Sequence, residues 1–145
     1  MLPDTPASAR SWRLLFSAWL VAMAATLGSL FFSEVMELVP CILCWYQRIF
    51  MFPLAVVLLA GLMASDRNVV RYAMPLTAIG LLVTLYHCLV FFGLIPENMR
   101  PCSQGVSCSD SGMVLAGFLP IPLLSLAAFL IIFVLLLNLQ SRKLS

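Results

Sequence analysis

The chain has 145 residues, of which 63% are hydrophobic and 10% are charged, and its formal net charge is +2. Water-soluble domains average roughly 45–50% apolar and about 25% charged residues, so this chain cannot build the polar shell that a soluble fold needs. The composition also excludes intrinsic disorder and a basic surface for nucleic acid, and it predicts that lipid surrounds most of the chain.

Four long uncharged stretches follow one another, at residues 14–33, 49–65, 72–96 and 111–141. Each stretch fits one crossing of the hydrocarbon core, which takes roughly 20 apolar residues of helix. Because backbone groups in lipid must bond within their own segment, the crossings are helices. We predict an all-α membrane protein, with a single integral membrane domain over residues 1–145. It is a bundle of four transmembrane helices, at about 14–32, 45–64, 72–95 and 113–137.

The first crossing has a second interpretation. Arg10 and Arg13, an apolar run and then Ala22-Met23-Ala24 also fit a secretory signal with a cleavage site. The apolar run continues to Phe32, which favours an uncleaved anchor.

The basic residues set the predicted orientation. Six of the eight flank the crossings on one face: Arg10, Arg13, Arg67, Arg71, Arg142 and Lys143. The positive-inside rule makes that face cytoplasmic. Both termini are then cytoplasmic, and two loops, at about 33–44 and 96–112, lie outside the cytoplasm.

Prolines fall in three of the predicted crossings. Pro53 lies in the second, Pro75 early in the third, and Pro120 and Pro122 in the first half of the fourth. We expect kinks or shortened helix starts there, with neighbouring groups bonding the freed carbonyls.

The chemistry lies in the five cysteines: Cys41, Cys44, Cys88, Cys102 and Cys108. Four of them fall in the two outward loops, as Cys-Ile-Leu-Cys and as Cys-Ser-Gln-Gly-Val-Ser-Cys. Disulfides form and persist outside the cytoplasm, so the two pairs predict redox-active or structural disulfides. Cys88 lies in an apolar crossing, where we expect it only to pack.

Cys41 and Cys44 lie where the first outward loop enters the second helix. Pro40 fits the start of that helix, so the pair occupies its first turn. The unbonded N–H groups of a helix start favour a thiolate. A structural disulfide is the alternative, but one that closes so short a loop stabilises little. We favour a redox-active pair.

Arg48 follows Cys44 by four residues and so shares its helix face, one turn deeper in the membrane. A charged residue in a crossing indicates a functional site, although a long side chain also permits snorkelling to the headgroups. The position beside Cys44 favours stabilisation of a thiolate or of the anion of a reduced acceptor. Gln47 adds a hydrogen-bonding group, or is only interfacial. Without haem or nucleotide motifs, and with Trp45 and Tyr46 alongside, we infer a lipid-soluble acceptor such as a quinone.

Cys102 and Cys108 lie in a short polar loop, which suits a pair that meets a protein partner. A fixed hairpin staple is the alternative, and the four outward cysteines also suit one tetrahedral zinc ion. The oxidising compartment favours disulfides, so we assign no metal ligands.

His87 is the only histidine and lies in the outer half of the third crossing. A lone histidine in a crossing faces the bundle interior by default. It contacts the acceptor's ring or relays a proton, or it has a hydrogen-bonded structural role.

These residues resemble a known family. Pro-Cys-x-x-Cys-Trp-Tyr-Gln-Arg, opening the second of four transmembrane helices, is similar to the DsbB family of bacterial disulfide-bond formation proteins. The Pro-Cys loop, the following Gly-Phe-Leu-Pro-Ile-Pro and Tyr86-His87 resemble its compact BdbC-like branch. The resemblance covers about residues 12–138. The short spacing of the second cysteine pair departs from the best-studied DsbB pattern, in which that pair is far apart.

The resemblance implies a relay in a bacterial cytoplasmic (inner) membrane, with its cysteines on the extracytoplasmic side. A reduced DsbA-like thioredoxin-fold protein would give electrons to a Cys102–Cys108 disulfide, with Cys102 forming the mixed disulfide. Cys108 would exchange with Cys41, and Cys44 would pass the electrons to a quinone (ubiquinone or menaquinone) beside Arg48. A DsbA-like partner has a reduction potential of about −120 mV, so its re-oxidation needs a strong terminal acceptor. Each 30 mV by which a two-electron transfer runs uphill costs about 1.4 kcal/mol.

Two other functions remain open. The related vitamin K epoxide reductase family carries its Cys-x-x-Cys after the loop pair, whereas this chain has it before. A membrane scaffold stapled by zinc or disulfides, without turnover, is the other alternative.

Overall fold

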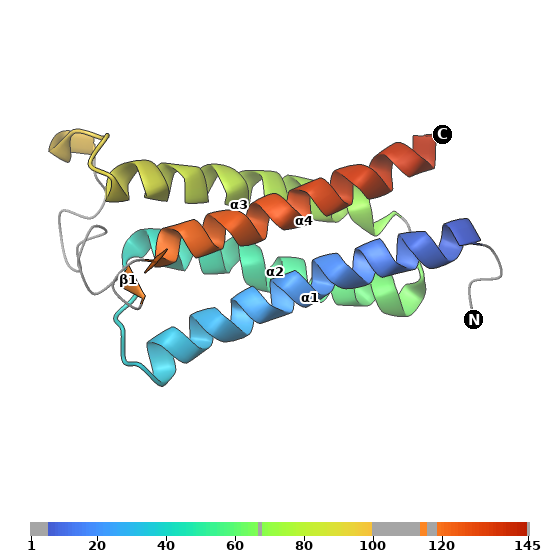
Figure 1. The fold of residues 1–145 in the computed structure, drawn as a ribbon, viewed down its shortest axis with the longest axis horizontal. Helices are drawn as coiled ribbons and strands as arrows, with labels where there is room; N and C mark the ends of the chain where they lie inside the picture. The colour runs from blue at the N-terminus through green and yellow to red at the C-terminus, as the bar shows by residue number, and fades with distance from the viewer. Residues whose placement is uncertain (1–5, 67, 100–113, 116–118, 145) are drawn as a thin grey trace.

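The computed structural model describes residues 6–66, 68–99, 114–115 and 119–144, and its described part is a bundle of four long helices (Figure 1). They are α1 (Pro6–Glu34), α2 (Ile42–Ala64), α3 (Val69–Phe91) and α4 (Ile121–Leu144). A 3-10 helix, η1 (Glu97–Met99), follows α3, and strand β1 (Val114–Leu115) pairs antiparallel with β2 (Leu119–Pro120) before α4. All four α-helices are long and apolar enough to cross a membrane. The predicted all-α, four-helix membrane fold is confirmed.

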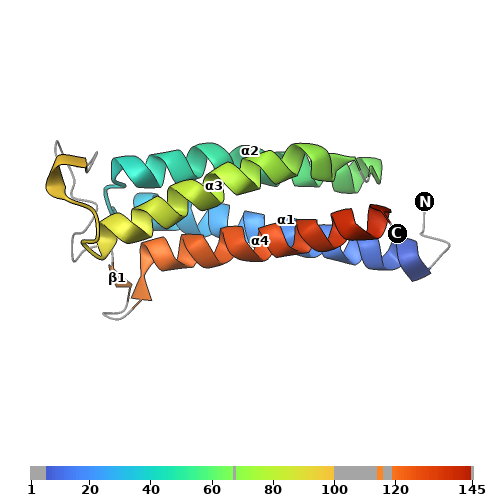
Figure 2. The ribbon, with the colours of Figure 1, turned by 90° about the horizontal axis from the view of Figure 1, so that it is seen from above.

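The helices form a closed ring in which each packs on two neighbours. Helix α1 contacts α2 and α4, and α3 contacts the same two helices. From above, α2 and α3 make one layer and α1 and α4 the other (Figure 2). The first turn of α2, the end of α3 and the start of α4 meet at one end of the bundle, opposite the α2–α3 turn (Figure 1). Residues distant in sequence therefore lie together at that end.

Backbone geometry ends α2 and starts α3 within a few residues. Ser65 has a left-handed φ of 51°, and the N–H groups of Ser65 and Asp66 donate to carbonyls of the last turn of α2. The side chain of Asp66 then accepts the backbone N–H of Asn68, at 2.8 Å. The bonds that the Ser65 and Asp66 N–H groups donate are a common way to satisfy the carbonyls left over at a helix end.

The bounds of the helices differ from those of the predicted crossings: α1 begins at Pro6 instead of near residue 14, and two further differences lie at the end of the bundle with the first cysteine pair. Helix α4 begins at Ile121, not near residue 113, and Pro122 lies in its first turn, where no internal N–H bond is lost. Pro120 precedes the helix instead of lying within it. Helix α3 ends at Phe91, not near residue 95, because Gly93 adopts a φ of 72° that does not continue a helix. Pro53 and Pro75 lie inside helices, as expected.

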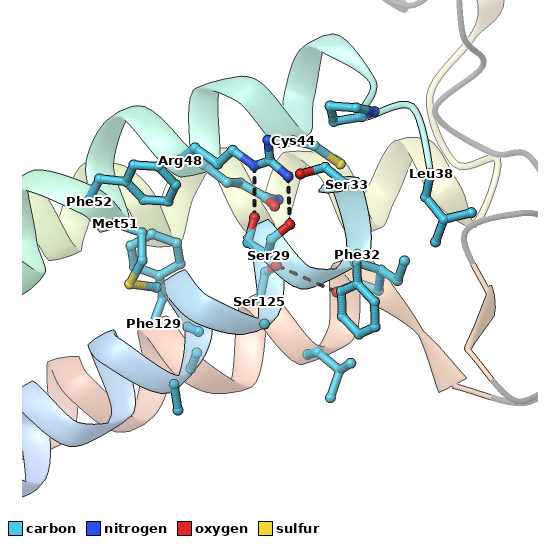
Figure 3. Close-up of a pocket in the computed structure, with 18 of the residues that line it drawn as sticks. Ser29, Phe32, Ser33, Leu38, Cys44, Arg48, Met51, Phe52, Ser125 and Phe129 are labelled. Carbon is cyan, nitrogen blue, oxygen red and sulfur yellow. Dashed lines mark hydrogen bonds between the residues drawn. The ribbon is translucent and has the colours of Figure 1, made fainter. Parts of the chain in front are cut away.

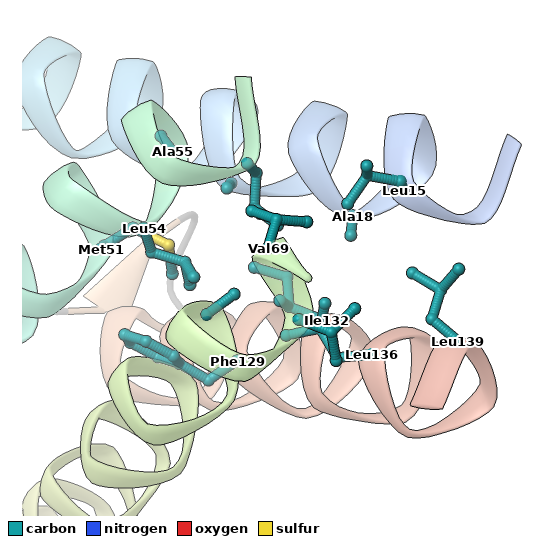
Figure 4. Close-up of a cluster of buried hydrophobic side chains, with 14 residues drawn as sticks. Leu15, Ala18, Met51, Leu54, Ala55, Val69, Phe129, Ile132, Leu136 and Leu139 are labelled. Carbon is teal, nitrogen blue, oxygen red and sulfur yellow. The ribbon is translucent and has the colours of Figure 1, made fainter. Parts of the chain in front are cut away.

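An apolar core fills the interior of the bundle (Figure 4). Its fully buried members include Leu54 and Leu58 of α2 and Phe129 and Ile132 of α4. Large apolar side chains also face outward, as expected where the surroundings are lipid; Met63 is 80% exposed. Small residues let the helices approach closely. A Cβ at Gly80 of α3 would overlap the ring of Phe129.

This close approach gives a test of the packing. We expect Gly80→Ala to lower the free energy of unfolding by about 1–3 kcal/mol, because the new Cβ would overlap the ring of buried Phe129 and force that ring to shift. Gly28→Ala in α1 is the matched control, because a Cβ there meets nothing within 4 Å. Denaturant unfolding in detergent measures both, and equal losses would contradict this packing.

Candidate functional site

The Cys-x-x-Cys motif forms the start of α2. Cys41 is the N-cap residue, with extended backbone (φ −70°, ψ 168°), and its carbonyl accepts the N–H of Trp45. Cys44 is the third residue of the helix. This geometry brings the two Sγ atoms to 3.4 Å, about 1.4 Å longer than a disulfide bond. The pair can close to a disulfide with small side-chain rotations.

Cys41 contacts a buried pair of polar side chains, His87 and Gln47, through His87. The Nε2 atom of His87, from α3, is 3.7 Å from the Cys41 sulfur. On the other edge of the ring, Nδ1 is 2.9 Å from the side-chain nitrogen of Gln47. His87 is fully buried and Gln47 nearly so. The imidazole is thus held between α2 and α3 by side chains from the first two turns of α2.

These neighbours change the acidity of Cys41, which lies just outside the membrane-spanning part of α2. Hydrogen bonding with the Cys44 side chain lowers the pKa of the Cys41 thiol most, and contact with His87 lowers it further. Burial acts in the opposite direction, but the pKa still lies well below that of an ordinary thiol. The surroundings of Cys41 therefore favour its thiolate form.

Arg48 is fixed by Ser29 of α1. Its Nε donates to the Ser29 hydroxyl and its Nη2 to the Ser29 carbonyl, both at 2.7 Å (Figure 3). The guanidinium also lies over the Trp45 ring, 5.4 Å from its centroid. These contacts hold the cation against α1, so its position is set by the bundle.

A pocket of about 690 Å³ opens between α1, α2 and α4 beside this cation. Cys44 and Arg48 line it from α2 (Figure 3). Gln47, from the same helix, also lines it. Apolar side chains make up most of the remaining wall, among them Phe32, Phe52 and Phe129. Residues 37–40, which precede the first cysteine in the chain, also line it. The size and the few convergent polar groups are typical of a small-molecule site.

The structure brings together five of the seven residues predicted for the site. Cys41, Cys44, Gln47, Arg48 and His87 lie around the start of α2. His87 is not among the pocket-lining residues and contacts Cys41 and Gln47 instead. Two others, Cys102 and Cys108, lie outside the described residues.

Cys88, which we expected only to pack, is a buried free cysteine in α3. Sequence reasoning missed Ser29, because a serine in an apolar helix usually bonds a carbonyl of its own preceding turn. Nothing in the chain order links it to Arg48, nineteen residues later.

The comparisons with known proteins that give a match all indicate the same family. The model of "Disulfide bond formation protein DsbB" matches residues 10–139. The chain is 49% identical over 136 residues to a probable disulfide formation protein of Metapseudomonas resinovorans, covering 93% of this chain and 94% of that one. It is 47% identical over 119 residues to probable disulfide formation protein C 2 of Bacillus cereus, covering 82% and 85%. It is 39% identical over 131 residues to disulfide bond formation protein C of Bacillus subtilis, covering 89% and 94%. No solved structure matches the chain.

The sulfur positions predict which disulfide forms. We expect mild oxidation of a variant with Cys102 and Cys108 both changed to Ser to join Cys41 to Cys44, because their sulfurs are 3.4 Å apart. Cys88 should remain a free thiol. Mass spectrometry of alkylated peptides identifies the linked pair. A link from Cys88 to either residue, or an unreacted Cys41–Cys44 pair, would contradict the geometry.

Proposed function

The chain belongs to the DsbB family of disulfide bond formation proteins, and we propose that it is a membrane thiol:quinone oxidoreductase. In this proposal it re-oxidises a DsbA-like thioredoxin-fold protein and passes the electrons to a membrane quinone. The membership and the four apolar helices establish a multi-pass membrane protein of disulfide formation. The quinone, the partner and the direction of electron flow are the proposed parts.

One observation carries the proposal: Cys44 and Arg48 line the same pocket, and Cys41 lies in contact with Cys44. The pocket volume of about 690 Å³ and its largely apolar wall suit a quinone ring and the start of its tail. Among the described residues, Arg48 uses two of its N–H groups on Ser29, and a guanidinium has five. The remaining donors suit a carbonyl oxygen of the ring.

In this proposal the residues at the start of α2 have different chemical roles. A bound quinone takes up the two electrons and two protons released when two thiols become a disulfide. Cys44 is the sulfur that faces the pocket, and Arg48 stabilises negative charge there. Cys41 is the sulfur of the Cys41–Cys44 disulfide that an incoming thiolate attacks; the S–S bond breaks and Cys44 leaves as a thiolate. The lowered pKa of Cys41 then makes it a good leaving group when the mixed disulfide is resolved. Gln47 lines the pocket and also contacts His87, so it connects the pocket with the imidazole that lies against Cys41.

The second cysteine pair supplies the link to the partner. We place Cys102 as the residue that forms the mixed disulfide with the DsbA-like protein, and Cys108 as the one that exchanges with Cys41. Tyr86 supports a location near the first pair, because its hydroxyl donates to the carbonyl of Met99 at 2.7 Å. Met99 precedes Cys102 by three residues, and Tyr86 packs on the cluster that contains Cys41.

The proposed orientation follows from charge. The end of the bundle with the first cysteine pair faces outward from a bacterial cytoplasmic (inner) membrane, and both termini face the cytoplasm. A thiol oxidase needs this orientation because disulfides persist outside the cytoplasm.

Anaerobic turnover tests the function. Reduced DsbA-like protein and a ubiquinone or menaquinone analogue are mixed with the full chain in detergent, and quinone loss is followed by absorbance. We expect Cys44→Ser to abolish quinone reduction, because the sulfur in the pocket is lost. Cys88→Ser should leave the rate nearly intact.

Both variants should keep wild-type helix content, which circular dichroism checks. Equal loss in the two variants, with normal folding, would exclude the relay. Failure of the wild-type chain to reduce any quinone with any reduced thioredoxin-fold partner would exclude the function itself.

The Ser29 contact gives a second prediction. We expect Ser29→Ala to raise the KM for quinone about tenfold, since a hydrogen bond to a charged group contributes about 1.5 kcal/mol or more. The kcat should change less, because Cys44 and Arg48 are still present. Ser29→Thr keeps the hydroxyl and should restore most of the affinity.

Ser17→Ala is the control, because the Ser17 hydroxyl donates to a carbonyl of its own helix and does not line the pocket. It should leave KM unchanged. An unchanged KM in Ser29→Ala would show that Arg48 does not act through this contact.

A further inference from the structure

Three metal-ligating side chains converge beside the pocket. The sulfurs of Cys41 and Cys44 and a ring nitrogen of His87 all lie within 4.8 Å of one another. Two thiolates and one imidazole are a common ligand set for zinc, in which three protein ligands leave a fourth position open. This set differs from the four-cysteine site considered from the sequence, because it takes its third ligand from α3.

We propose that the reduced protein binds one thiophilic divalent cation, Zn²⁺, between Cys41, Cys44 and His87. Both thiols lose their protons, two S–Zn bonds and one N–Zn bond form, and no electrons are transferred. The disulfide form cannot bind the ion in this way, because its sulfurs are no longer thiolates.

The distances fit a tetrahedral ion. Zinc at about 2.3 Å from each sulfur holds two sulfurs roughly 3.8 Å apart, close to the observed 3.4 Å. The Cys41 sulfur is already 3.7 Å from Nε2 of His87. Only small side-chain rotations are needed to place all three groups around one centre.

The surroundings also favour the ion. Gln47 holds the far ring nitrogen of His87 at 2.9 Å, as outer hydrogen bonds orient many zinc-bound imidazoles. With the Gln47 amide turned to accept from Nδ1–H, the lone pair of Nε2 faces the sulfurs. Zn²⁺ with two thiolates has no net charge, so the complex avoids the cost of burying an ion beside fully buried His87.

Zinc titration of the reduced full-length chain, under anaerobic conditions and against a chromophoric chelator, tests the proposal. We expect about one equivalent to bind, and Co²⁺ in its place to give thiolate-to-metal charge-transfer absorption. Binding should be lost in Cys44→Ser and weakened by at least about tenfold in His87→Ala. His87→Gln should behave alike, which guards against misfolding of one variant.

Two controls separate this site from others. The double variant Cys102→Ser/Cys108→Ser should bind zinc as tightly as the wild type, and so should Cys88→Ser. The oxidised wild-type chain, which keeps every residue, should not bind. Loss of binding in the double variant, full affinity in both His87 variants, or no binding by the reduced wild type would each overturn the proposal. None of these results depends on quinone turnover.

Discussion

The arrangement of the site depends on one partly buried charge and the group that satisfies it. A guanidinium at lipid depth is costly unless protein groups bond it. Arg48 meets this requirement with the hydroxyl and the carbonyl of Ser29, both at 2.7 Å, so α1 and α2 are joined one turn from Cys44. Because a bare guanidinium cannot remain in lipid, this contact fixes the cation where the pocket opens. The pocket therefore presents a fixed cation within a largely apolar wall.

The same helix turn gives its two sulfurs different surroundings. Cys41 caps the helix and lies against His87, only 1% exposed, whereas half-buried Cys44 faces the pocket that Arg48 lines. A spacing of three residues at a helix start allows both the contact between the sulfurs and this difference in direction. In the proposed relay, electrons enter at Cys41 and leave from Cys44, so the surroundings of each sulfur can suit its own step.

Local pattern was enough to predict much of this. Charge spacing gave the four helices, and the Pro-Cys-x-x-Cys order placed the cysteines in the first turn of α2. It also placed Arg48 on the face of Cys44. Contacts between helices could not be derived, because the sequence does not say how each helix is rotated: the Ser29–Arg48 and His87–Cys41 contacts both depend on that rotation. The start of α4 was misplaced because apolar residues before Pro120 resemble a crossing by composition alone.

The burial of Cys41 constrains how the proposed relay works. Its sulfur is covered by an apolar cluster that includes Leu43 and Val90, with Tyr86 packed against it. A thiol that attacks Cys41 must first displace part of that cluster, whereas Cys44 already faces the pocket. Exchange with the second cysteine pair is then coupled to an opening at the end of the bundle. Reduction of the acceptor needs no such opening. Tyr86 packs against this cluster and its hydroxyl donates to the carbonyl of Met99, so the cover of Cys41 is joined to the chain that follows α3.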